Sequence, residues 1–409
     1  MVGLRRRDLS GATPYAESGP TPAQQGDTSS MGLILTENQI ILRDMGQSFF
    51  DEKSPVTRMR ALRDADDATG FSQPLWREMG ELGWLGIPFP ERVGGSAMGY
   101  GELGVVLEQC GRVLAPEPFL ASILLGGNMI LLGGSEELQD RILPSVCTGE
   151  TVLCLAFEER GRFAPWSIET TAKADGDGWV IDGRKKFVLD GQAANQIVVV
   201  ARTSGAAGQR SGLSAFVVDA GTAGIRVERS QLLDGHGVAT IEFSNVAASA
   251  DSLIGEVDGA GEVLERTLDR ATIGLCAEMV GCFGEAFERT LAYLKIREQF
   301  GVKIGTFQAL RHRASHMFGE LEFARSVVRD AQSAIDEDRD DSSLAASSAK
   351  ARCSDVAKLI AGEAVQMFGG IGMTDEEEIG LFFKRLKASE LTLGDSIYHR
   401  DRYATLRGY

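Results

Sequence analysis

The fold is decided by a twelve-residue stretch, Arg297-Glu298-Gln299-Phe300-Gly301-Val302-Lys303-Ile304-Gly305-Thr306-Phe307-Gln308, where one long helical pattern ends and another begins. The side chain of Arg297 can pair with a phosphate, that of Phe300 can stack on a ring, and the glycines permit a tight connection. An arginine and a phenylalanine beside a helical turn also serve structural roles. The stretch by itself is therefore consistent with both a ligand-binding role and a structural role, and the neighbouring regions are needed to distinguish them.

Apolar residues recur every three to four positions on both sides of this stretch. The two stripes are Leu264, Leu268, Ala271, Leu275, Met279, Phe283 and Phe287, and then Leu310, Ala314, Met317, Leu321, Ala324 and Val328. Such spacing is typical of one face of an amphipathic helix, and long antiparallel helices build a bundle. We therefore expect residues 256–409 to form a C-terminal four-helix bundle.

Two further regions precede the bundle. Residues 151–255 contain short β-rich runs such as Ile197–Ala201 and Leu213–Val218, separated by turn signals such as the one at 175–178. Because no helical pattern lies between these runs, they favour an antiparallel barrel or sandwich over a doubly wound sheet. Residues 31–150 are helical in pattern, with one crossing rich in glycine and proline. The predicted class is α+β, with a helical N-terminal domain, a middle antiparallel β domain and the bundle.

The composition excludes several classes of protein. A net charge of -16 disfavours a nucleic-acid or anionic-membrane surface, since those partners are held by clustered lysine and arginine. No apolar run approaches the roughly 20 residues that span a bilayer. The six cysteines lack the CxxC spacing of a zinc site. We expect a cytoplasmic protein with reduced thiols, without nucleic-acid binding or membrane insertion.

Residues 1–30 are rich in glycine, proline, serine, threonine and glutamine, and Met31 stands directly before the first helical pattern. This composition predicts a disordered N-terminal tail, or a segment upstream of the natural start. Arg5-Arg6-Arg7 suggests a twin-arginine export signal, but the residues that follow are polar instead of apolar. The sequence therefore favours retention in the cytoplasm.

Two other motifs accompany the central stretch. Gln366-Met367-Phe368-Gly369-Gly370-Ile371-Gly372-Met373-Thr374 follows a helical pattern and not a strand, so it is not a Rossmann fingerprint. Thr374 and Glu377 after it have the spacing of a capping box. Near the start, Glu81-Leu82-Gly83-Trp84-Leu85-Gly86-Ile87 leads to Pro90-Glu91-Arg92-Val93-Gly94-Gly95.

Taken together and in this order, the motifs closely resemble the acyl-CoA dehydrogenase family, whose signature reads R-x-x-F-G-x-x-I followed by F-Q. The resemblance covers about residues 34–405. It implies FAD bound between the β domain and the bundle, desaturation of an acyl-CoA substrate, an electron-transfer flavoprotein as electron acceptor, and a tetramer. The cofactor-binding residues that it implies, reaching across a dimer interface to a partner's FAD, are Arg297, Phe300, Gln308, Gln366, Gly369 and Gly370.

The catalytic base of the family is missing from its usual places. Many members carry it as the glutamate of a Y-E-G-T run, where this chain has Leu393, and others carry it on the preceding long helix, where this chain has Ala271. Neither side chain accepts a proton. The nearest carboxylate, Asp269, lies two residues earlier and so about 200° round the helix. It could contact CoA, act as a displaced base, or be a solvated helix residue.

The β-domain motifs also depart from the family. Residues 157–162 replace T-E-P-x-x-G-S-D and residues 185–190 replace K-x-W-I-T-N, which removes two hydroxyl groups near the flavin. The retained trans-acting residues and the lost base resemble the small subunit of heteromeric enzymes such as pimeloyl-CoA dehydrogenase. Residues 382–386, the run Leu393-Gly394-Asp395 and His399 support that subgroup. A homologous partner would then supply the base.

Other interpretations stay open at this point. The chain could form a self-sufficient homotetramer with Asp269 or another unusual base, or a catalytically silent scaffold on the same fold. A flavin monooxygenase or oxidase is a further possibility, because one fold can host several chemistries. His312 and His316 have the i,i+4 spacing of a metal pair, but no third ligand stands at a sensible distance. We therefore expect packed or hydrogen-bonded histidines.

Overall fold

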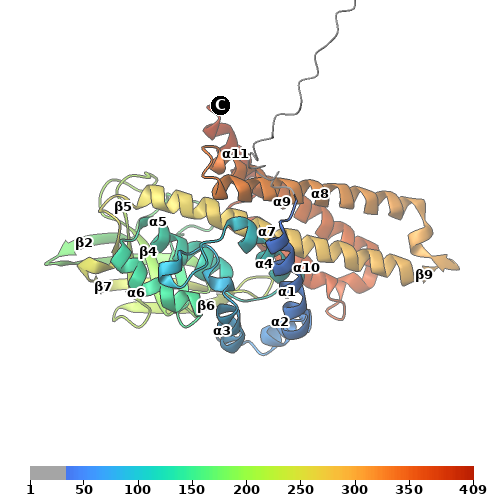
Figure 1. Cartoon of the computed structure of the whole chain (residues 1–409), viewed down its shortest axis with the longest axis horizontal. Helices are drawn as coiled ribbons and strands as arrows, with labels where there is room; N and C mark the ends of the chain where they lie inside the picture. The colour runs from blue at the N-terminus through green and yellow to red at the C-terminus, as the bar shows by residue number, and fades with distance from the viewer. Residues whose placement is uncertain (1–33) are drawn as a thin grey trace, which may run out of the picture.

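The computed structural model describes residues 34–409, so the predicted tail at 1–30 lies outside the described residues (Figure 1). Helices come first along the chain: α1 (Glu37–Lys53), α2 (Val56–Asp64), α3 (Gln73–Glu81), α4 (Tyr100–Arg112), α5 (Asn128–Gly133) and α6 (Glu136–Cys147). Short 3-10 turns, η1 (Trp84–Gly86) and η2 (Glu91–Val93), occupy the crossing rich in glycine and proline, and a π-helical segment, η3 (Phe119–Gly127), precedes α5. Helix α1 begins at a capping box that Thr36 and Gln39 form.

The middle region is one sheet with the strand order β6-β7-β3-β2-β4-β5-β8, and β1 pairs with β4 beside this path. The strands are β1 (Leu153–Ala156), β2 (Thr171–Asp175), β3 (Gly178–Leu189), β4 (Gln196–Arg202), β5 (Leu213–Asp219), β6 (Ile225–Gln231), β7 (Gly237–Ala248) and β8 (Leu253–Ile254). Most neighbours are antiparallel, as predicted, but β1 and β2 both run parallel to β4. The antiparallel expectation was wrong for these two pairs, because β3 runs back against β2 and the chain then enters β4 in the direction of β1 and β2.

Strand β4 is buried on both faces. Ile197, Val199 and Ala201 belong to a core on one face of the sheet, whereas Val198 and Val200 belong to the larger core shared with the helices. Because side chains alternate along a strand, this strand connects the two cores. The β domain is therefore packed firmly against the helical regions.

The C-terminal region contains α7 (Ala260–Ile296), α8 (Gln308–Asp336), α9 (Ser342–Phe368), α10 (Ile379–Leu391) and α11 (Ser396–Leu406). The first four form the predicted bundle, and α11 packs on α9 (Figure 1). The predicted capping box was wrong, since α10 begins only at Ile379. The hydroxyl of Thr374 instead donates to the carbonyl of Ile371 at 2.8 Å.

Close backbone contact fixes α4 across α7. A Cβ on Gly281 would lie 1.8 Å from the carbonyl oxygen of Glu108, and one on Gly111 would lie 1.9 Å from that of Glu278. Only glycine allows the two helices to approach this closely. Within residues 34–409, no helix combines the length and the apolar composition needed to cross a bilayer. All six cysteines lie in this range as buried free thiols, as expected.

Candidate functional site

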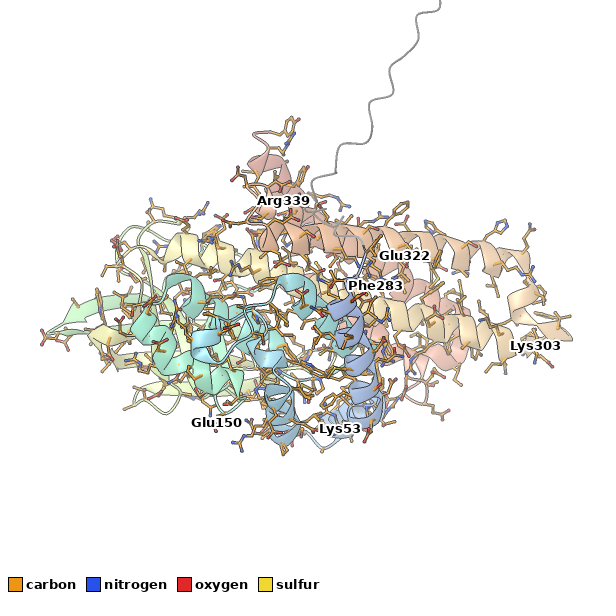
Figure 2. All side chains as sticks on the ribbon, in the orientation of Figure 1. Lys53, Glu150, Phe283, Lys303, Glu322 and Arg339 are labelled. Atoms are coloured by element: carbon orange, nitrogen blue, oxygen red, sulfur yellow. The ribbon has the colours of Figure 1, made fainter. Side chains whose placement is uncertain are left out.

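The central stretch forms a hairpin at the end of the bundle away from the β domain, where Figure 2 labels Lys303. Strands β9 (Glu298–Gln299) and β10 (Val302–Lys303) are joined by Phe300 and Gly301, whose φ angles are 53° and 76°. Positive φ at both turn positions is strained for a phenylalanine. The Phe300 ring is nonetheless 91% exposed. An exposed aromatic ring on a strained turn indicates contact with a molecule outside the chain.

Aromatic stacking places the second motif at the same end. The ring of Tyr293 stacks on that of Phe368 with 4.3 Å between centroids. Tyr293 lies one turn before Arg297, whose amide donates to the Tyr293 carbonyl at 2.9 Å, and Phe368 directly precedes Gly369. The two glycines are open, since a Cβ on Gly369 would meet no described atom within 4 Å outside its chain neighbours. We call this end, with Arg297, Phe300, Gln308, Gln366, Gly369 and Gly370, the distal end.

The other predicted site residues lie elsewhere, in the turn between α10 and α11. Leu393 is buried, and both it and Gly394 have positive φ, 58° and 96°. The carboxylate of Asp395 accepts hydrogen bonds from the amides of Ile397 and Tyr398, at 3.0 and 2.9 Å, and so caps α11. The sequence Leu393-Gly394-Asp395 therefore forms a tight turn followed by a helix cap. We call it the LGD turn.

Two buried basic side chains hold the LGD turn. Lys350 donates to the carbonyls of Glu390 and Gly394, at 2.9 and 2.7 Å. His399 donates from Nε2 to the carbonyl of Leu393 at 2.9 Å, while its Nδ1 has no hydrogen-bond partner among the described residues. Burial lowers the pKa of Lys350 to about 8 and that of His399 to about 3. Sequence reasoning did not single out Lys350.

Asp269 is buried in an ion pair. Its carboxylate accepts from Nη1 of Arg402 at 2.6 Å and from the hydroxyl of Ser343 at 2.6 Å. Ala271, two residues further along α7, is completely buried. Both oxygens of this carboxylate already accept hydrogen bonds, Oδ1 from Arg402 and Oδ2 from Arg402 and Ser343. This geometry suits a structural role better than that of a displaced base.

The altered β-domain motifs contact each other. Lys185, completely buried, pairs with Glu159 at 2.7 Å, and the Glu159 carboxylate also accepts from the amides of Glu169 and Thr170. Burial lowers the pKa of Lys185 to about 8 and raises that of Glu158 to about 7. The two segments are thus fastened by a buried ion pair.

Sequence reasoning missed a buried cluster of charges around Arg385. Its guanidinium contacts Asp234 at 2.7 Å and Glu278 at 2.8 Å, and Asp234 also lies 2.9 Å from Nδ1 of His236. The same guanidinium reaches the carbonyls of Leu114 and Ala115 at 3.4 Å. One side chain therefore joins the N-terminal helices, the β domain and the bundle.

A cavity of about 40 Å³ lies beside this cluster, between the β domain and the bundle. Its walls include Leu189 at the end of β3 with Asp190 after it, Leu275 and Glu278 on α7, and Thr392 beside the LGD turn. Burial raises the pKa of Asp190 to about 6. Ligand pockets usually measure about 300–1,000 Å³. The space between the domains is therefore too small for the ring system of FAD. At the distal end, exposed Arg297 and the open glycines have the chemistry to contact the phosphates of such a cofactor.

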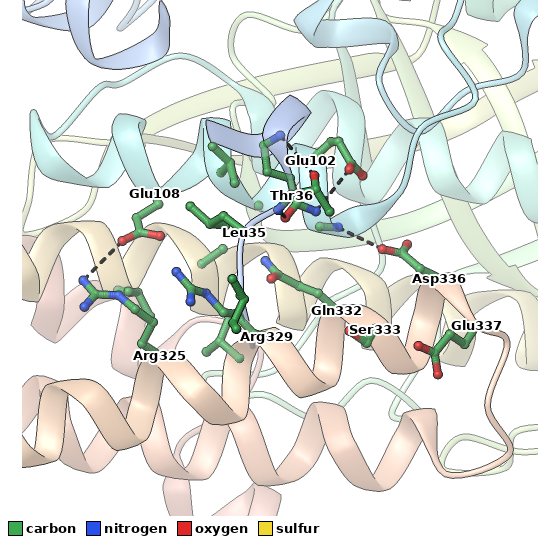
Figure 3. Close-up of a pocket in the computed structure, with 18 residues that line it drawn as sticks. Leu35, Thr36, Glu102, Glu108, Arg325, Arg329, Gln332, Ser333, Asp336 and Glu337 are labelled. Atoms are coloured by element: carbon green, nitrogen blue, oxygen red, sulfur yellow. Dashed lines mark hydrogen bonds and ion pairs between the residues drawn. The ribbon is translucent and has the colours of Figure 1, made fainter. Parts of the chain in front are cut away.

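A second hollow, of about 190 Å³, lies between the start of α1, α4 and α8 (Figure 3). Its charged groups serve the fold: Asp336 accepts from the amides of Tyr100 and Gly101, and Arg325 pairs with Glu108 at 3.3 Å. None of the predicted site residues lines it. His312 and His316, which have the i,i+4 spacing, are both exposed, so neither is packed in the core. Nε2 of His316 lies 3.8 Å from a carboxylate oxygen of Glu320.

Comparison with known proteins covers nearly the whole described chain. Residues 36–150, 154–246 and 259–405 match the N-terminal, middle and C-terminal domains of acyl-CoA dehydrogenase. The probable acyl-CoA dehydrogenase FadE25 of Mycobacterium tuberculosis is 31% identical over 82% of this chain and 88% of its own length. Subunit CarC of the caffeyl-CoA reductase-Etf complex of Acetobacterium woodii is 28% identical over 89% and 96%.

Solved structures agree with this result. A variant of the Tcur3481-Tcur3483 steroid ACAD is 30% identical with a TM-score of 0.81, covering 91% of this chain and 98% of that one. Butyryl-CoA dehydrogenase from Megasphaera elsdenii, at 23% identity, has the same fold with a TM-score of 0.84, covering 92% and 99%. The resemblance drawn from the motifs is confirmed at this level. The chain belongs to the acyl-CoA dehydrogenase family.

Proposed function

We propose that this chain is a subunit of a flavin-dependent acyl-CoA dehydrogenase that completes the FAD site of a homologous partner in a heterotetramer. One observation carries the proposal: the six residues for which the family resemblance implies FAD binding lie at the distal end, whereas both base positions hold side chains that cannot accept a proton, Leu393 and Ala271. The chain therefore offers FAD contacts outward but lacks its own base.

The residues of the distal end suit this role chemically. Arg297 is exposed and can pair with a phosphate of the partner's cofactor, and Phe300 can stack on an aromatic ring. The open backbone at Gly369 and Gly370 allows close approach of a pyrophosphate. In the complex, FAD would accept the hydride from the β-carbon of the acyl-CoA. The partner would supply the base that removes the α-proton.

Two relatives support the proposed partners, a homologous chain and an electron-transfer flavoprotein. The Tcur3481-Tcur3483 structure carries the names of two proteins, and CarC is a subunit of a complex with an electron-transfer flavoprotein. We propose a similar assembly with a homologous chain and an electron-transfer flavoprotein as acceptor. Within the family, we place the chain with the small subunits related to that of pimeloyl-CoA dehydrogenase, in the cytoplasm.

The test is a count of FAD per subunit. The chain is purified alone and after co-expression with a homologous chain that carries the missing glutamate. We expect little FAD alone and about one FAD per heterodimer in the complex. Phe300→Ala should lower that occupancy, while Tyr409→Ala, which removes an equally exposed ring (92%) outside the distal end, should not. Near-stoichiometric FAD in the lone chain would refute the proposal.

A further inference from the structure

We infer that the chain's own site between the β domain and the bundle is closed, so that it admits neither a flavin ring nor an acyl chain. Each heterodimer would then hold one active site instead of two. The inference rests on the proposed function and adds where, and by which residues, the second site is shut. Three separate structures around the LGD turn carry it.

The first is an aromatic wall packed on the turn. The ring of Phe163, from the segment after β1, meets that of Tyr398 on α11 edge to face, with 4.9 Å between centroids, and Phe157 lies behind it at 6.2 Å. A Cβ on Gly394 would lie 2.6 Å from the Tyr398 ring and 3.1 Å from the Phe163 ring. The two rings therefore fill the space directly against the turn at which the family carries its base.

The second is a ladder of ion pairs that ties the β domain to two helices. Arg210, before β5, pairs with Glu265 on α7, and its guanidinium lies over the ring of Trp166 at 5.1 Å. Arg402 on α11 reaches both Glu265, at 3.2 Å, and Asp269, at 2.6 Å. Each charged group in the ladder is partnered. Nothing in it remains free to receive a ligand unless an existing pair is broken.

The third is the charged interior of the remaining space. Arg385 and Asp234 are almost completely buried, and Asp190 and Glu278 line the same cavity. A cavity of about 40 Å³ holds only a few water molecules. Its walls are mixed, and an acyl chain placed there would displace the water beside Asp190, Asp234 and Glu278 and leave these carboxyl groups less solvated. The cavity is therefore too small for an acyl chain.

These three structures act on different elements, so no single side-chain movement opens the site. Opening would require the Phe163 ring, the Arg402 ladder and the Arg385 cluster to rearrange together. At the same time Lys350 and His399 fix the LGD turn from behind. The site is therefore closed by side chains packed in the interior and not by a single loop.

Two measurements on the assembled complex test the closure. The first is the number of FAD molecules per wild-type heterodimer, which needs no variant of this chain. One FAD supports the closure, even if Phe300→Ala leaves that FAD in place and so contradicts the trans role. Two FAD molecules per heterodimer would overturn it.

The second measurement attempts to restore the base. Leu393→Glu is placed in this chain while the partner's own glutamate is replaced by glutamine, and the complex is assayed with the acyl-CoA that the wild-type complex oxidises. We expect no recovered turnover, because substrate cannot reach the turn. Leu393→Gln serves as the isosteric control for folding, read from the assembly and melting of the complex. Turnover that returns with Glu and not with Gln would overturn the closure.

Discussion

Replacing Arg385 by methionine should strongly destabilise the protein. The guanidinium is 2% exposed and holds Asp234, 1% exposed, and Glu278, 14% exposed. Removing one partner of a buried ion pair typically costs about 3–5 kcal/mol, because the remaining charges stay buried without compensation. Methionine preserves much of the apolar volume, so the loss reports on the charges. We therefore expect a loss in that range.

The three regions of the chain can unfold in separate steps, and the assay has to detect each of them. Large proteins rarely unfold in two states, so midpoints of thermal and urea unfolding should be compared together with native-state proteolysis. Arg226→Met is the matched control, because Arg226 is 75% exposed and lies 3.7 Å from Glu242. A surface pair of this kind contributes about 0–1 kcal/mol. Adding Asp234→Asn to Arg385→Met should recover part of the loss. A shift for Arg385→Met no larger than the control would refute the reasoning.

Three further predictions concern ionisable groups near the LGD turn. Because the pKa of Lys350 is lowered, the unfolded chain binds more protons than the folded chain between pH 8 and 10.5. The free energy of unfolding should therefore rise by about 3 kcal/mol across that window. Lys350→Met should abolish this rise, as measured by melting at a series of pH values. The lowered pKa of His399 predicts a dependence of the same sign at acidic pH. Stability should fall by several kcal/mol as the pH drops from 6.5 towards 3, and His399→Gln should flatten that fall in urea titrations. Asp269→Asn should lower the melting temperature, because Arg402 loses the nearer of its two carboxylate partners, yet it should change turnover of the complex less than about 2-fold. A loss of turnover of about 10²-fold or more would identify Asp269 as the base.

The sequence was most informative where periodicity and motif agreed. The stripes from Leu264 to Phe287 and from Leu310 to Val328 predicted the two long helices that the hairpin connects. Strands β2 and β6 escaped notice because they are short of apolar residues: Ile225–Gln231 is mostly exposed along its length. With only Ile225 and Val227 apolar in β6, the alternation is too short to predict a strand. The parallel pairing of β1 had no sequence signal at all, since it depends on the path between two distant strands.

The candidate site also has a part that the sequence predicted and a part that it did not. The six distal-end residues followed from the family signature, but the cluster around Arg385 did not, because its partners Asp234 and Glu278 lie far away in sequence. One feature of the sequence could have predicted that Arg385 is buried in an ion pair. Arg385 stands at helical spacing from Leu381 and Phe382 on the buried face of α10, and a cation on an apolar face needs a buried partner. The identity of that partner required the fold.

Two strained turns among the C-terminal helices have opposite meanings, although both place a large apolar residue at positive φ, Phe300 and Leu393. The strain at Leu393 is offset inside the chain, because Lys350 and His399 bind the surrounding carbonyls and Asp395 caps the next helix. At Phe300, the described residues supply only the short β9–β10 pairing and an edge-to-face contact with the Phe307 ring at 6.2 Å, and Phe300 is exposed. Strain persists only where the surroundings over-determine it. A turn that is fully satisfied within the chain indicates a structural role, whereas a strained turn that presents an exposed ring indicates a binding role fulfilled by another subunit.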